Sequence, residues 1–171
     1  MKKLIALFAA IVFVSGLTTV NAQVTASATG TANVITPIAI TNSGNMNFGN
    51  LAVSPTVSGT LTILPGGTRT TDGAGGVTLP AVTGTFNPAS FTVTGLGSST
   101  FSITLPTTYT ITDGASHNMT VTGFTSTPSG TGTLASGTLV IKVGATLNVA
   151  AGQFAATYTN ATGFPVQVNY N

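Results

Sequence analysis

The 171-residue chain contains no cysteine and no tryptophan, and only 4% of its residues are charged. The lack of cysteine excludes disulfides, thiolate metal sites and a lipid-anchored cysteine at a lipoprotein cleavage site. The only acids are Asp72 and Asp113, and the only histidine is His117. Calcium loops need clustered carboxylates, which two isolated aspartates do not supply. We therefore expect no bound metal ion and no cofactor.

Groups that carry enzyme chemistry are equally scarce. Asp113 and His117 stand four apart in TDGASHNMT, a spacing that would pair them on a helix, but the glycine and serine between them favour a loop. We interpret His117 as a surface-loop histidine and predict that the protein is not an enzyme. The stretch SGTGTLA matches G-x-G-x-x-A through Gly130, Gly132 and Ala135, but no helix is predicted to follow it and hold a phosphate. The sequence thus offers no catalytic or cofactor-binding residues.

The first residues have the layout of a secretory signal peptide. Lys2 and Lys3 precede an apolar run from Leu4 to Val14, which is too short to span a bilayer comfortably, and small residues follow. We predict that residues 1–22 are cleaved as a signal peptide. The protein would then pass through the periplasm to the cell surface or the medium.

Removal of this leader leaves Arg69, Lys142 and two aspartates, so the mature chain has no net charge. A neutral chain gives no support to a role in binding nucleic acid or an anionic membrane. A surface with so few charges associates readily. We expect it to meet other copies or a partner.

What is abundant is threonine, valine and isoleucine, which suit β-strands, whereas most strong helix formers are rare. Short alternating runs recur between glycine, proline, asparagine and serine. They are GTLTILP, SFTVTG, STFSITLP, NMTVTGF, GTLVIKV, ATLNVAA and QFAATYTN, together with MNFGNL and VTLPAV. With the two ends of the mature chain, this pattern predicts an all-β fold. We expect a single immunoglobulin-like or pilin-like β-sandwich of about ten strands.

Both ends of the mature chain alternate without any charge. The stretch QVTASATGTANV, broken by Pro37, predicts an N-terminal extension strand over residues 23–34 and a domain over residues 35–171 that begins with a strand near Ile38 to Thr41. The apolar face of the extension consists of Val24, Ala26, Ala28, Gly30, Ala32 and Val34. The last strand, GFPVQVNYN, has Phe164, Val166, Val168 and Tyr170 on one face. Unguarded edges invite pairing, and we expect each end to pair by β-augmentation.

Several segments carry a resemblance that covers the mature chain. They are the Ala/Thr-rich extension with Gly30, ITPIAIT (35–41), MNFGNLAV (46–53), GTRTTDGAGGVTLP (67–80), ASFTVTG (89–95) and the tail from VGATLNV to the C-terminus (143–171). On these segments the chain resembles the bacterial domain-of-unknown-function family 4402. That family is in turn similar to pilin and spore-coat-U-like subunits of archaic chaperone–usher fibres. The resemblance implies a structural subunit of a surface fibre that donates its extension to a neighbouring copy.

The resemblance also implies residue roles. The six even-numbered residues of the extension would form the donor face, with Gly30 at a shallow pocket that has no room for a side chain. The four C-terminal residues Phe164, Val166, Val168 and Tyr170 would border the acceptor groove, with Tyr170 matching the penultimate aromatic of pilins. A periplasmic chaperone would hold this strand first, and an outer-membrane usher would follow. The remaining partners would be other copies or related subunits.

Four alternatives stay open. Many archaic-type subunits have a disulfide that this chain lacks. The first alternative is therefore that the chain folds alone and that its own extension closes its sheet. A monomeric adhesion module that binds carbohydrate or matrix would need exposed aromatic residues. A small outer-membrane barrel would need strands of about ten residues with aromatic girdles. An ice-binding surface would need a fixed repeat to stack pairs such as Thr120/Thr122; no constant period is present, and solvent-facing threonines on strands explain the pairs.

Overall fold

The computed structural model describes residues 22–171, so the predicted signal peptide lies outside the described residues except for Ala22. The chain divides into two units, residues 1–34 and 35–171. In the first unit, residues 22–34 form no strand and are exposed. Across residues 22–171 there are twelve strands and no helix, and hence no helix that crosses a membrane. The predicted all-β class is confirmed.

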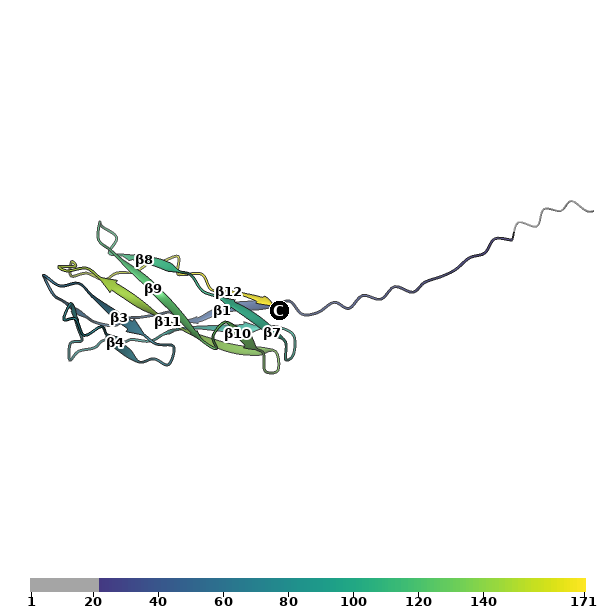
Figure 1. Ribbon diagram of the computed structural model, residues 1–171, viewed down its shortest axis with the longest axis horizontal. Coiled ribbons are helices and arrows are strands. Elements are labelled where there is room, and N and C mark those ends of the chain that lie inside the picture. Colours follow the sequence, from purple (N-terminus) through teal and green to yellow (C-terminus); the bar gives the residue numbers. More distant parts are fainter. Residues whose placement is uncertain (1–21) are drawn as a thin grey trace, which may run out of the picture. The chain divides into compact units, whose positions relative to one another are not determined.

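The strands of the second unit are mostly short, with two long ones (Figure 1). They are β1 (Ala39–Gly44), β2 (Ala52–Val53), β3 (Gly59–Ile63), β4 (Arg69–Thr71), β5 (Val77–Thr78), β6 (Ala89–Thr94), β7 (Thr100–Thr104), β8 (Thr108–Thr112), β9 (Asn118–Thr127), β10 (Thr131–Thr133), β11 (Thr138–Val149) and β12 (Gln167–Tyr170).

β11 is the central strand of a seven-stranded antiparallel sheet. Lys142 and Val143 pair with β6 and also with β9, so these neighbours lie on opposite edges of β11. Further along, β3 replaces β6 on its edge, while β9 continues on the other. Gly144 lies at the position on β11 where β3 takes the place of β6. A Cβ on this residue would collide with the carbonyl oxygen of Ile63. The two strands predicted from GTLVIKV and ATLNVAA are therefore one strand of 12 residues, because β9 pairs with both parts.

A second sheet of three strands has the order β10-β7-β12. Its inward residues Phe101 and Ile103 share one core cluster with Phe91, Val93 and Ile141 of the large sheet. Phe101, Val93 and Ile141 are fully buried. These contacts come from the alternation of apolar residues along β6, β7 and β11, which turns every second side chain toward the same side.

The other half of the large sheet is covered by irregular chain. Its core cluster contains Leu61, Val121 and Leu147, and the residues packed over them come from the chain around residues 46–53 and from Tyr158. The strand predictions for MNFGNL and QFAATYTN are wrong, since each stretch has only one isolated bridge. The physical reason is that their backbones bond to turns, side chains and one edge strand instead of to a continuous ladder.

Candidate functional site

A groove of about 1030 Å³ separates the two irregular segments that cover the large sheet. One wall comes from residues 42–51 and the other from residues 156–164. Within residues 22–171, no hydrogen bond joins one wall to the other. The floor is formed by core side chains that include Phe91, Tyr109, Met119, Val121 and Leu147. Apart from the half-buried Tyr109, these floor residues are at most 8% exposed, so the groove lies directly above a covered core.

Arg69 holds the first wall in place. Its Nη1 donates to the carbonyl oxygens of Phe48 (2.8 Å), Asn50 (3.0 Å) and Thr83 (3.3 Å). The guanidinium also lies 4.5 Å from the ring centre of Phe86, and the side chain is only 9% exposed. No acid pairs with it among the residues described, so carbonyl dipoles and a ring face stabilise this buried cation.

Sequence reasoning assigned no role to Arg69. The signal that was available is its isolation, because it is the only arginine in a chain that has almost no charge. A residue type that is rarely fully buried unless its charge is balanced needs several partners in the folded state. Which carbonyls supply those partners follows only from the tertiary structure.

The second wall attaches to the edge strand β8. Thr159 and Thr112 exchange two backbone hydrogen bonds of 2.8 and 2.9 Å, and Asn160 Nδ2 donates to the carbonyl of Thr110 (2.9 Å). Tyr109 Oη donates to the carbonyl of Asn160 (3.2 Å). Burial raises the pKa of Tyr109, against a smaller lowering by the backbone of Gly163, and keeps this hydroxyl protonated as a donor.

Phe164 stands where the second wall meets the floor. Its ring centre is 5.0 Å from Phe124, 5.7 Å from Tyr109 and 6.0 Å from Phe91. The last two contacts are edge-on, a favourable geometry for aromatic pairs. Phe164 therefore anchors the wall to the core from outside any strand.

The three following apolar residues of the C-terminal segment lie on the same side as Phe164. Val166, Val168 and Tyr170 are half-buried against the core, whereas Gln167 and Asn169 between them are exposed. The strand itself, β12, is shorter than the sequence predicted and begins only after Pro165. β12 pairs with β7 alone and β1 pairs with β6 alone. The two strands lie close together beside the C-terminus without pairing (Figure 1), so each keeps an unpaired edge.

The hydroxyl of Tyr170 ties the last strand to the start of the domain. It accepts a hydrogen bond from the backbone N–H of Leu96 (2.6 Å) and donates one to the carbonyl of Thr36 (3.0 Å). Gly95 has to be a glycine because a Cβ there would collide with this hydroxyl. Beyond packing on the core, Tyr170 thus fixes Thr36, the residue next to the first residue of the domain.

Replacing Tyr170 by phenylalanine is expected to loosen this start. The variant loses two hydrogen bonds, so we expect about 1–2 kcal/mol less stability and faster amide exchange or proteolysis around residues 35–38. Tyr158→Phe is the matched control, since that hydroxyl donates to the Phe154 carbonyl and accepts from Gln153. Equal protection of residues 35–38 in both variants would contradict the assignment.

The predicted donor residues of the extension are all exposed. Val24 is 92% exposed and Val34 is 93% exposed, and Ala26, Ala28, Gly30 and Ala32 between them are exposed as well. No atom lies within 4 Å of the place where a Cβ of Gly30 would stand. Their role as a donor face stays a prediction.

Asp113 and His117 do meet, but in the turn between β8 and β9 and not on a helix. Asp113 Oδ2 is 2.6 Å from His117 Nδ1, and Oδ1 accepts from the backbone N–H groups of Ala115 and His117. His117 is 42% exposed at its side chain and stacks on Phe154 with ring centres 4.7 Å apart. Over residues 22–171 no third histidine, cysteine or acid joins them to form a metal site. The contact between Asp113 and His117 therefore stabilises the turn between β8 and β9.

This pair makes an acid-dependent contribution to stability. The hydrogen bond from His117 holds the pKa of Asp113 below its usual range, helped by the two backbone N–H donors and opposed by burial. A depressed carboxyl pKa stabilises the fold above the ordinary value of about 4, and this stabilisation is lost as the pH falls through the lower, folded-state value. We expect the thermal midpoint of Asp113→Asn to fall less with acid than that of the parent protein. An equal fall of the thermal midpoint with acid in Asp113→Asn and the parent protein would contradict the role.

The glycine-rich match SGTGTLA leads into β10 and then into the turn before β11, so no helix N-terminus follows Gly130 and Gly132. Gly132 itself lies in β10, where it pairs with Phe101. The candidate site therefore consists of the groove, its two walls and the unpaired edges of β1 and β12.

No curated protein and no solved structure matches the chain. One family does, and it is described as "Domain of unknown function (DUF4402)". The match runs from residue 38 to residue 170, from the residue before β1 to the end of β12, and leaves out the extension. Because it covers well over half of the sequence, the chain belongs to the DUF4402 family.

Proposed function

We propose that this protein is a non-enzymatic structural subunit of a surface fibre, and that copies assemble by donating the extension, residues 23–34, into the groove of a neighbour. The observation that carries the proposal is the groove of about 1030 Å³ whose floor consists of core side chains. A strand inserted into this groove would place its alternate side chains directly above the core and extend the layer that covers it.

A strand is the occupant that suits this groove best. β1 and β12, which continue from its walls, each have an unpaired edge, and neither carries a charged residue or proline. The one irregularity is a register shift in β1 between Asn42 and Gly44. A strand laid along such edges gains main-chain hydrogen bonds, and its alternate side chains enter the apolar floor. The same insertion would complete a β-sandwich layer over the second core cluster.

The extension of a second copy has the matching chemistry. It alternates small apolar residues with threonine, serine and asparagine, and Val24 and Val34 at its two ends are almost fully exposed. Small side chains such as Ala26 and Ala28 fit a narrow groove. Since each copy has one donor and one acceptor, the contact is head-to-tail and produces an open-ended filament.

This route also accounts for the other expected partners. A subunit whose groove is unfilled needs another strand in it before assembly. Supplying this temporary strand is the task of a periplasmic chaperone. The outer-membrane usher would then exchange that occupant for the next subunit. Cleavage of residues 1–22 would place the chain in the periplasm and leave the extension at its free N-terminus.

The test is the size and electron microscopy of the mature protein with and without residues 23–34. We expect filaments or SDS-resistant, heat-dissociable ladders for the full mature chain and monomers after the deletion. A monomer that unfolds on deletion would instead show that the extension closes its own sheet. A monomer in both samples, with unchanged stability, would overturn strand donation altogether.

A further inference from the structure

The outward face of the large sheet carries threonines in register. Residues directly opposite each other in antiparallel strands lie on the same face. Across β8, β9, β11, β3 and β4 the partners form one continuous row, which consists of Thr108, Thr122, Thr146, Thr62 and Thr70. The hydroxyls of Thr62 and Thr146 are 2.8 Å apart. Strand pairing thus aligns threonines that have no constant period in the sequence.

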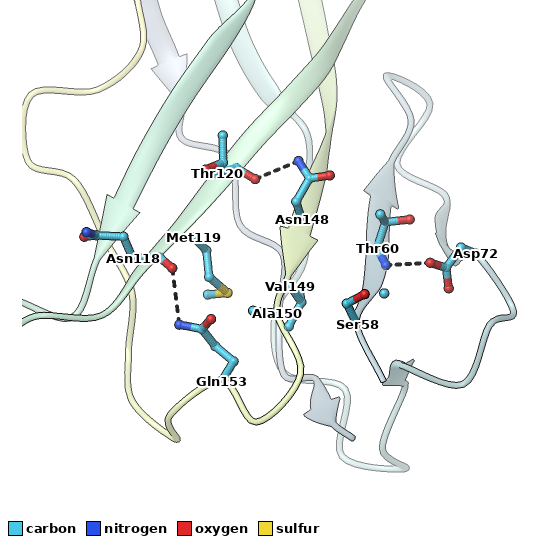
Figure 2. A pocket seen from close by; sticks show the side chains of 11 residues that line it. Ser58, Thr60, Asp72, Asn118, Met119, Thr120, Asn148, Val149, Ala150 and Gln153 are labelled. Carbon is cyan, nitrogen blue, oxygen red and sulfur yellow. Dashed lines mark hydrogen bonds between the residues drawn. The ribbon is translucent and has the colours of Figure 1, made fainter. Parts of the chain in front are cut away.

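The neighbouring row leads into a recess. It runs through Thr110, Thr120, Asn148 and Thr60, again as direct partners. The last three line a hollow of about 440 Å³, together with Asp72, Asn118 and Gln153 (Figure 2). Met119 and Val149 add an apolar part to the lining, which includes no basic residue.

The amide groups of this recess are held in fixed orientations. Asn148 Nδ2 donates to the Thr120 carbonyl (3.0 Å) and to Thr122 Oγ1 (2.9 Å). Gln153 Nε2 donates to the Asn118 carbonyl (3.3 Å) and to Tyr158 Oη (2.8 Å). Figure 2 shows that the side-chain oxygens of Asn148 and Gln153 point away from these partners. Both oxygens are therefore able to accept hydrogen bonds from a ligand.

An exposed aromatic stands next to the recess. Phe154 directly follows Gln153, and its ring, 59% exposed, stacks on His117, which directly precedes Asn118. The stacking partner and the Asp113 bond behind it keep the ring in place. A fixed, exposed ring beside a polar hollow provides a flat apolar face for a ligand.

We propose that this recess binds a neutral sugar unit of a polysaccharide. Sugar hydroxyls match the hydroxyl, amide and carboxylate groups of the lining, and the C–H face of a sugar ring matches the exposed ring of Phe154, which follows Gln153 in the chain. Met119 and Val149 are only 7% and 2% exposed and offer little apolar surface. The absence of basic residues from the lining disfavours anionic ligands. The volume lies within the range of about 300–1000 Å³ that is typical of small-ligand pockets.

A flat crystalline ligand such as ice fits less well. Adjacent strands are rotated by roughly 20–25° in an ordinary sheet, so rows of threonines across five strands do not form a plane. The hollow also interrupts the rows. Both features favour a compact unit seated in the recess.

The recess is separate from the groove, with Met119 as the only residue that lines both. Sugar binding therefore goes beyond the assembly proposed above and does not depend on it. If both hold, each subunit of the fibre presents one such recess.

The test is an array of neutral and charged oligosaccharides, with hits titrated against the soluble protein by calorimetry. We expect binding of neutral sugars such as glucose, galactose, mannose or N-acetylglucosamine oligomers. Thr120→Arg, which fills the recess from an exposed strand position, should weaken binding at least about tenfold. Thr125→Arg, on the same strand but outside the recess, should leave binding unchanged.

Three further variants separate this proposal from misfolding and from assembly. Phe154→Ala should also weaken binding, and Phe154→Tyr should retain it. A protein without residues 23–34 should bind the same sugars, whatever its oligomeric state. Binding of no sugar, a preference for charged sugars, or equal binding by Thr120→Arg and Thr125→Arg with unchanged thermal midpoints would overturn the proposal.

Discussion

A single aspartate in place of Ala28 is expected to abolish the multimers of this protein. Ala28 lies in the middle of the apolar face of the extension, and donation would bury it against the floor of the groove. An unpaired carboxylate in such a place costs several kcal/mol. We expect donation to weaken by at least about two orders of magnitude, because each 1.4 kcal/mol is about tenfold. Gel electrophoresis without heating and size-exclusion chromatography measure the outcome.

Thr29→Asp is the matched control for this variant. It adds the same charge one residue further along the chain, on the opposite face of the predicted strand. We expect its multimers to persist and the thermal stability of the unassembled domain to be unchanged in both variants. Equal loss of multimers in both would mean that charge repulsion, and not burial of one face, controls assembly.

Replacing Arg69 by methionine should give a large loss of stability. The change keeps an unbranched apolar stem but removes the donors to three carbonyls, whose hydrogen bonds with Arg69 are part-buried. Each buried group without a partner costs about 1–3 kcal/mol, and relief of a buried cation offsets part of the sum. We expect a net loss of about 3 kcal/mol in chemical denaturation. Multimers should also decrease, since Phe48 and Asn50 line the groove.

Lys142→Met provides the control for Arg69→Met. Lys142 is the other basic residue of the described domain, and it is exposed on β11. Its replacement removes the same charge without freeing any carbonyl, so we expect a change within about 0.5 kcal/mol. Arg69→Lys should recover only part of the loss, because one ammonium group does not reproduce the spread of the guanidinium. Similar stability for Arg69→Met and Lys142→Met would show that the three carbonyl contacts matter little.

Local alternation predicted well those strands that carry core residues. β3, β6, β7 and β9 were found in the runs GTLTILP, SFTVTG, STFSITLP and NMTVTGF, because burial on one side selects a period of two. MNFGNL and QFAATYTN alternate just as clearly, yet form walls of the groove. Their backbone groups bond to Arg69, Asn87 and Thr112, partners that lie far away in the sequence.

Four strands were not predicted at all, and one of them, β2, has only two residues. β4, β8 and β10 are short and rich in threonine, and only β8 contributes apolar residues, Tyr109 and Ile111, that pack against a core cluster. Threonine has a general preference for strands but does not indicate a partner. These segments became strands because an edge of β3, β9 or β7 was available to pair with them.

The sequence by itself determined the all-β class, the family and the absence of charge from residues 23–34 and 163–171, since composition and local alternation are properties of neighbouring residues. Only the tertiary structure decided that Tyr170 holds Thr36, that Arg69 secures one wall of an open groove, and that threonines form rows across five strands. The physical reason is that strand register and long-range hydrogen bonds join residues many positions apart. The pairing of β11 with three neighbours, and not any repeat along the chain, brings Thr146 beside both Thr62 and Thr122.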